Sequence, residues 1–216
     1  MDRNTAWKES SGKLSLEFDG INDHVVLNIP TGLPSITFSG WFNFPQLGNN
    51  VVYAQQPGAP VQTFYVNTTA TGRLGFLVGS SLNGLDYEFF RTNAEPAIVL
   101  NKWLHIAFAW NGKSNTQRIF VDGVALNSFA ATNRTNFLIG AGTTPLWIGR
   151  LENGYSSFQF DDLRMYDRAL TAPEFGQMYG RGRGGGMLCQ PPRRRSVAAV
   201  IAALVLACET GNYSLT

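Results

Sequence analysis

Apolar and polar residues alternate in short runs through most of the chain. The clearest run lies at residues 104–110, where every second residue is a large apolar one. A period of two predicts a β-strand with its heavier face on a core. A second apolar-rich run, 118–121, follows Asn111-Gly112 and ends at Asp122-Gly123. Both dipeptides are typical of tight reversals because their residues tolerate positive φ, so residues 103–123 predict two adjacent antiparallel strands.

The same alternation recurs at turn spacings of about 8–12 residues, which is typical of a sandwich or barrel. One short helix is predicted near the end of this region, with Thr171 as its N-cap and Glu174 at the third helical position. The sequence thus predicts an all-β, antiparallel β-sandwich. Its predicted strands are 14–18, 24–29, 36–44, 51–54, 63–66, 74–78, 87–90, 98–100, 104–110, 118–121, 146–148 and 157–166.

Composition changes this picture at the two ends of the chain. Residues 1–12 are polar and predict a loose N-terminal arm, while 13–180 form the sandwich domain and 181–216 a flexible basic C-terminal tail. The net charge is +2, and residues 177–216 contribute +4 through five arginines and one glutamate, leaving −2 for the rest. The mild negative charge of residues 1–176 argues against a nucleic-acid-binding domain. The basic tail could still bind an anionic partner.

The tail combines a Gly/Arg linker at 180–186 with an uncharged apolar run at 197–207. Eleven residues are far short of the ~20 that span a bilayer as a helix, so no transmembrane span is expected. We expect the run to act as an anchoring strap that docks on the domain or on neighbouring subunits, because an exposed run would promote aggregation. The alternative is an association with a membrane surface. Cys189 and Cys208 both lie in the tail, and whether they pair is open.

Five segments resemble the laminin-G-like family, which has the concanavalin A-like sandwich fold. They read LEFDG with DHV at 16–25, FSGWF at 38–42, WLHIA at 103–107, RIFVDG at 118–123 and FDDLRMYDRALT at 160–171. A strand ending in Ile148-Gly149 also fits the family pattern. The resemblance covers about residues 13–180. It implies a jelly-roll fold, but the family contains lectin modules, adhesion modules, enzyme appendages and virion components, so it leaves function open.

Acidic residues do not form a catalytic set in this sequence. Glycoside hydrolases of this fold place carboxylates at alternate positions of one strand. Glu17 and Asp19 have that spacing but run into a turn without a third partner, and Asp161-Asp162 are neighbours. His24 and His105 lie in strand patterns without a nearby Ser or Cys nucleophile. We therefore expect no enzyme and no catalytic residues.

The resemblance implies a structural Ca²⁺ site, because many members of the family bind this cation through oxygen ligands. The candidate ligands are Asp19, Asn22 and Asp23 near the first turn, and Asp161 or Asp162 on the closing strand. The first and last strands of such a sandwich are often neighbours, which would let the two pairs converge. The alternative is that Asp19 and Asp23 only shape the turn and that Asp161 and Asp162 bond backbone or Arg164.

The pattern assigns no residues to a glycan site, and the ligand-binding residues are left open. Sugar sites combine aromatic rings with amide and carboxylate groups. Trp41, Trp103, Trp110 and Phe108 are expected in the core. Aromatic residues left available are Tyr53, Tyr65, Tyr87, Trp147 and Tyr155, with Asn49, Asn50, Asn83 and Asn153 in presumed loops.

These features predict a non-catalytic recognition or structural module displayed on a larger assembly, such as a virion or a cell-surface layer. Neighbouring subunits would bind the 181–216 tail, and surface glycans are candidate ligands. The alternatives are a soluble Ca²⁺-dependent lectin or an ancillary domain of a glycoside hydrolase. The first 13 residues lack the apolar segment of a secretion signal, so a virion or extracellular location requires another route or a processed chain.

Overall fold

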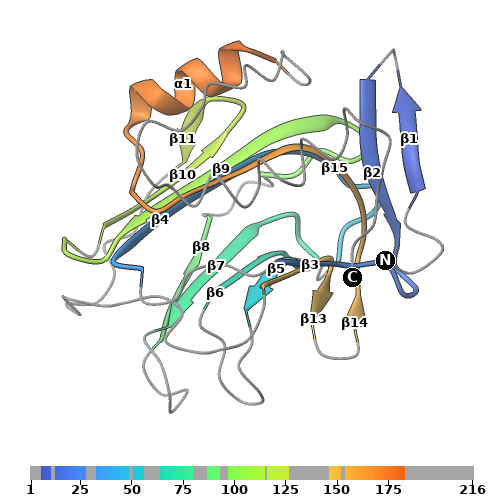
Figure 1. The fold of residues 1–216 in the computed structure, drawn as a ribbon, viewed down its shortest axis with the longest axis horizontal. Helices are drawn as coiled ribbons and strands as arrows, with labels where there is room; N and C mark the ends of the chain where they lie inside the picture. The colour runs from blue at the N-terminus through green and yellow to red at the C-terminus, as the bar shows by residue number, and fades with distance from the viewer. Residues whose placement is uncertain are drawn as a thin grey trace.

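Two antiparallel sheets stack face to face, and a short helix lies on the outside of the larger sheet (Figure 1). The computed structural model describes residues 6–10, 13–27, 33–48, 51–55, 64–79, 87–92, 97–114, 116–126, 146–151 and 154–182. The predicted tail from residue 183, with Cys189 and Cys208, lies outside the described residues, as do residues 28–29 at the end of one predicted strand.

The larger sheet has seven strands in the order β1-β2-β15-β4-β9-β10-β11. The first and last of the predicted strands, β2 and β15, are neighbours as expected. The bounds of the seven strands are β1 Ala6–Ser10, β2 Lys13–Asp19, β4 Ser35–Asn43, β9 Trp103–Asn111, β10 Thr116–Val121, β11 Val124–Leu126 and β15 Ser157–Tyr166.

The second sheet has six strands in the order β3-β12-β5-β6-β7-β8, and β13 with β14 forms a separate two-stranded ribbon. The antiparallel sandwich predicted from the alternation is confirmed. The bounds are β3 Val25–Leu27, β5 Val51–Gln55, β6 Phe64–Thr68, β7 Leu74–Gly79, β8 Tyr87–Arg91, β12 Leu146–Ile148, β13 Arg150–Leu151 and β14 Gly154–Tyr155.

Large apolar side chains fill the space between the sheets. Phe18 lies edge-on to Phe158 and Phe160, with ring centres 5.2 and 5.3 Å apart, a favoured geometry for aromatic pairs. Phe108 and Trp110 of β9 are also buried here, as predicted. Each fully buried Phe or Leu contributes roughly 1.5–3 kcal/mol, so this aromatic layer is the main source of stability.

The helix α1 (Ala172–Gly180) covers part of the outer face of the seven-stranded sheet (Figure 1). Phe175 of α1 is fully buried, and its ring centre lies 4.3 Å from that of Phe120 in β10. Ala107 and Ala109 belong to the same cluster, and their small side chains suit the close approach of the helix. This is why β4 and β9 are buried on both faces along seven of their nine residues.

The helix start confirms the predicted N-cap at Thr171. The Glu174 carboxylate accepts the Thr171 backbone N–H at 2.8 Å, which satisfies one orphan donor of the first turn. Among the described residues, no helix is long and apolar enough to cross a membrane.

Two local predictions are wrong. Ala6–Ser10, expected within a loose arm, forms β1 and pairs with β2. An edge strand is held by backbone hydrogen bonds along one side, so its sequence needs no apolar period. Residues 98–100 are not a strand: Ile98 is buried, but Val99 and Leu100 are 50% and 40% exposed, and a turn begins at Leu100. Three consecutive apolar residues resemble a short strand in the sequence, although only Ile98 of the three is buried.

Candidate functional site: a polar depression on the seven-stranded sheet

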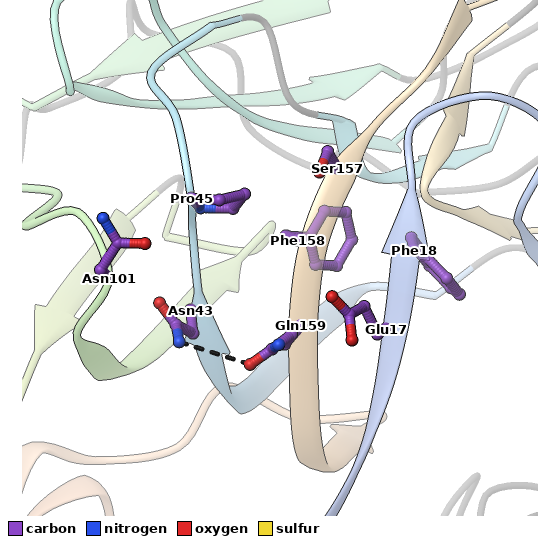
Figure 2. Close-up of a pocket in the computed structure, with 8 residues that line it drawn as sticks. All are labelled: Glu17, Phe18, Asn43, Pro45, Asn101, Ser157, Phe158 and Gln159. Atoms are coloured by element: carbon purple, nitrogen blue, oxygen red, sulfur yellow. Dashed lines mark hydrogen bonds between the residues drawn. The ribbon is translucent and has the colours of Figure 1, made fainter. Parts of the chain in front are cut away.

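Three polar side chains form a row across the outer face of the seven-stranded sheet. The strand register places Glu17 of β2 opposite Gln159 of β15, and Gln159 opposite Asn43 of β4. Their inward-facing neighbours, such as Phe18 and Phe158, are buried in the core. Because side chains alternate between faces, all three polar groups lie on the side away from the core. Figure 2 shows them side by side, on three adjacent strands.

A shallow depression of about 170 Å³ lies at this row. It is lined by Glu17, Phe18, Asn43, Pro45, Asn101, Ser157, Phe158 and Gln159 (Figure 2). Asn43 Nδ2 donates to Gln159 Oε1 over 3.4 Å, a long hydrogen bond that orients both amides. Asn43 Oδ1 is enclosed and has no hydrogen-bond partner among the described residues.

The turn before β9 closes one side of the depression. Asn101 adopts a positive φ of 56°, a conformation that Asn tolerates better than most residues. Its backbone N–H donates to the Phe44 carbonyl at 2.9 Å, which ties the turn to the end of β4. The Asn101 amide thus faces the same space as Asn43 (Figure 2). The lining offers amide donors, amide acceptors and one carboxylate, a set suited to a hydroxyl-rich ligand.

Asp19 and Asp23, the first pair of predicted calcium ligands, are close together at the turn after β2. Asp23 is buried, and its Oδ2 accepts the Asp19 backbone N–H at 2.9 Å. Asp19 Oδ1 accepts the Ile21 N–H at 2.7 Å. Both side chains thus shape the turn.

Asp161 and Asp162, the second pair, lie at a bulge in β15. Asp162 has a positive φ of 49°, and both of its carboxylate oxygens accept from Arg164 at 2.8 Å. Asp161 Oδ1 accepts the Asp162 backbone N–H at 2.7 Å. The bulge shifts the register between Asp161 and Arg164, so these residues do not follow simple strand alternation.

The register separates these two acidic pairs. Asp19 is opposite Ser157, so Asp161 lies four residues, about 13 Å, further along the neighbouring strand. Among the described residues, no group of three or more His, Cys, Asp or Glu side chains could hold a metal ion. The four carboxylates therefore do not fit a single Ca²⁺, whose ligands lie about 2.3–2.6 Å from the ion. Calcium binding by this chain stays a prediction.

His105 lies on the same outer face but under the end of α1. It is 3% exposed, and its ring centre lies 5.3 Å from Trp41 and 6.0 Å from Tyr179 of the helix. Burial lowers the pKa of His105 to about 4, with Asp122 raising it in part and Arg164 lowering it. Its Nδ1 has no hydrogen-bond partner in the described part of the chain. The neutral ring is thus a packing element of the helix contact.

Aromatic residues divide between core and surface partly as predicted. Trp41 is buried, but it lies opposite His105 on the outer face, stacked on Tyr179, rather than between the sheets. Trp103 is half-buried at the start of β9. Trp147 and Tyr155, expected to be available, are half-buried. The side chains of Tyr53, Tyr65 and Tyr87 and the residues Asn49, Asn50, Asn83 and Asn153 lie outside the described part.

The sequence pattern missed Asn43, Gln159 and Asn101 as site residues. A weak signal was present, since Asn43 and Gln159 each occupy an outward parity position next to large apolar residues. Only the pairing of β2, β15 and β4 brings these positions together.

Solved structures share this architecture at low sequence identity. A heptameric SAP-like pentraxin from Limulus polyphemus is 15% identical, with 85% of this chain and 90% of that chain covered and a TM-score of 0.60. The ligand binding domain of botulinum neurotoxin serotype D, solved with N-acetylneuraminic acid, is 10% identical, with 83% and 45% covered and a TM-score of 0.63. Trypanosoma rangeli sialidase is 13% identical, with 80% and 28% covered and a TM-score of 0.58.

At such identities the likeness concerns the fold alone, and this chain spans less than half of the toxin domain and of the sialidase. No protein of curated function matches the sequence significantly. The sequence itself matches the laminin G family described as the concanavalin A-like lectin/glucanases superfamily over residues 19–175. Since that match covers most of the sandwich, this chain belongs to the concanavalin A-like lectin/glucanase superfamily.

Proposed function

We propose that this chain is a non-catalytic glycan-recognition module that binds sugar hydroxyls in the polar depression. The observation that carries the proposal is the row Glu17–Gln159–Asn43, which the register of three strands holds on an outward face. Amides and a carboxylate at fixed spacing suit adjacent hydroxyls of a pyranose, which both donate and accept hydrogen bonds. A volume of about 170 Å³ is small beside the 300–1,000 Å³ of drug-sized sites, and suits a single sugar unit.

The lining also supports binding without catalysis. Glu17 is the one ionisable group among the eight lining residues. Glycoside hydrolysis generally requires two carboxylic groups that flank the scissile bond. Asp19 lies on the same face, but its carboxylate is engaged with the turn at Ile21. The fold neighbours include a toxin ligand binding domain solved with a sialic acid and a sialidase, so glycan chemistry recurs on this fold.

The experiment is a glycan array probed with the full-length chain, followed by titration calorimetry with the best binders. Gln159→Ala and Asn43→Ala should each weaken binding about tenfold, the cost of one lost hydrogen bond of about 1.4 kcal/mol. Arg118→Gln is the control, since Arg118 is exposed on β10 away from the depression. An array without signal contradicts glycan binding, whereas unchanged affinity in both alanine variants contradicts this site.

The proposal includes display on a larger assembly, on a virion or a cell surface, with the 181–216 segment as the strap that neighbouring subunits hold. It rests on the apolar run at 197–207 behind a Gly/Arg linker. Co-sedimentation of the full chain with its native assembly should be lost when residues 183–216 are removed. Equal incorporation of the shortened chain would contradict the strap.

A Ca²⁺-dependent lectin is the competing function. Repeating the glycan titration with and without a chelator separates the two, because binding through the amide row needs no ion. Loss of binding in the chelator, restored by Ca²⁺, would favour the competing function.

A further inference from the structure

The two sides of the polar depression differ in chemistry. The side formed by β2 and β15 carries the Glu17 carboxylate and the Ser157 hydroxyl. The side formed by the end of β4 and the turn before β9 carries the amides of Asn43 and Asn101 and the ring of Pro45. All eight lining residues belong to the described part of the chain. A ligand therefore meets oxygen groups on one side, and amide and apolar groups together on the other.

The backbone holds the amide side in a fixed arrangement. The hydrogen bond from the Asn101 N–H ends on the carbonyl of Phe44, which lies between Asn43 and Pro45 in the chain. Phe44 itself is fully buried in the core, so both lining residues beside it are anchored. Figure 2 shows the two amides and the Pro45 ring around one side of the depression.

The groups on this side are open to a ligand. Asn101 and Pro45 are exposed and Asn43 is half-buried. Figure 2 shows one hydrogen bond among the lining residues, between Asn43 and Gln159, so the Asn101 amide is not bonded to another lining residue. A side-chain amide both donates and accepts, whereas the proline ring offers apolar surface only. This side thus suits a small group that combines a polar amide with a methyl group.

We propose that this side takes the acetamido group of an N-acetylhexosamine, an inference that rests on the glycan binding proposed above. The acetamido N–H would donate to the Asn101 amide oxygen, and its carbonyl would accept from an amide N–H of Asn101 or Asn43. Its methyl group would pack on Pro45. A sugar hydroxyl in the same place makes hydrogen bonds but leaves the proline ring uncovered. The neighbouring ring hydroxyls then face Gln159, in a space of about 170 Å³ that suits one sugar unit.

The test uses the full-length chain and two pairs of methyl β-glycosides. The members of each pair differ only at C2: N-acetylglucosaminide against glucoside, and N-acetylgalactosaminide against galactoside. Titration is followed by NMR through the side-chain amide signals of Asn and Gln. We expect an acetamido sugar to bind about tenfold more tightly than its hydroxyl partner, which corresponds to one buried methyl group and one neutral hydrogen bond.

Variants locate this preference. Asn101→Gly removes the amide but accepts the φ of 56°, so the turn should be kept and the preference should fall to about twofold or less. Pro45→Ala should lose part of the preference. Gln159→Ala should weaken both members of a pair equally and leave their ratio unchanged, and Arg118→Gln should change neither affinity. Unfolding midpoints check each variant, and if Pro45→Ala does not fold, Asn101→Gly carries the test.

The outcomes separate this inference from the proposed function. Equal affinity within both pairs, or no binding of either acetamido sugar, overturns the acetamido site while an array signal that depends on Gln159 still supports glycan binding. A preference that survives in folded Asn101→Gly also contradicts the site. Equal binding of N-methylacetamide alone would show that the amide is bound without the sugar, and it too contradicts the N-acetylhexosamine.

Discussion

The backbone N–H of His105 donates a 2.9 Å hydrogen bond to Oδ1 of Asp122, and the Asp122 N–H donates back to the His105 carbonyl at 2.9 Å. This pair joins the start of β9 to the turn that follows β10. Asp122 adopts a φ of 50° and Gly123 a φ of 76°, so the predicted Asp-Gly reversal is a turn with two left-handed residues. One aspartate therefore serves both the turn and the neighbouring strand.

Asp122→Ala should lower the free energy of unfolding by roughly 2 kcal/mol or more, because it orphans the His105 N–H and places alanine in the left-handed region. Asp122→Asn keeps a side-chain oxygen and tolerates that conformation, so its cost should stay below about 1 kcal/mol. Urea unfolding followed by tryptophan fluorescence measures both. Equal costs for the two variants would show that the hydrogen bond contributes little.

Stability should depend on pH through His105. Burial lowers its folded pKa to about 4 from the ordinary 6.5, so the unfolded chain binds the proton first as pH falls. This contribution is fully present above pH 6.5 and is lost progressively as pH falls toward 4. The loss is roughly 3 kcal/mol, since one pKa unit corresponds to about 1.4 kcal/mol.

His105→Gln should flatten this dependence, measured as the free energy of unfolding at several pH values between 7 and 4. Comparison with the wild type removes the contribution of the carboxylates, and His24→Gln, at a half-buried histidine, is the matched control. A His105→Gln variant with the same slope as the wild type would contradict the assignment.

The N-terminus of α1 provides a second pH-sensitive contact. Hydrogen bonding from Arg168, followed by the Thr171 backbone N–H, lowers the pKa of Glu174 to about 2. The stabilisation from this carboxylate is present above its ordinary pKa of 4.5 and is lost as pH falls toward 2. Glu174→Ala should cost about 1 kcal/mol at pH 7, as for lost helix caps.

Glu174→Gln separates the two contacts, because it keeps an acceptor for Thr171 but loses the charge next to Arg168. Exposed ion pairs contribute about 0–1 kcal/mol, so its cost at pH 7 should be the smaller of the two. If glutamine and alanine cost the same, the ion pair rather than the cap stabilises the helix start.

Among the glycines that the structure describes, Gly149 is the one whose replacement should cost most. It has a φ of 80°, and a Cβ there would overlap the ring of Phe18 in the core. Gly149→Ala should destabilise the fold by roughly 2–4 kcal/mol, from left-handed strain and overpacking together. Gly48→Ala is the control, since a Cβ at Gly48 meets nothing within 4 Å. Thermal unfolding compares the two, and a Gly149→Ala midpoint close to that of Gly48→Ala would refute the clash.

The sequence by itself determined the antiparallel sandwich, most strand bounds and the capped helix start, because alternation and turn residues act over a few neighbouring positions. It placed Phe108 and Trp110 in the core by parity alone. It could not indicate that Ala6–Ser10 pairs with β2, since an edge strand owes its place to backbone bonds from another segment.

Only the tertiary structure decided what packs against each face of the strands. Parity put Trp41 in a strand, but the packing of α1, and above all Tyr179, made its outward face a buried one. The pairing of β2, β15 and β4 brought Glu17, Gln159 and Asn43 into one row, and the same register kept Asp19 and Asp161 apart. Strand pairing is a long-range choice made by the whole core, so no local pattern of residues specifies it.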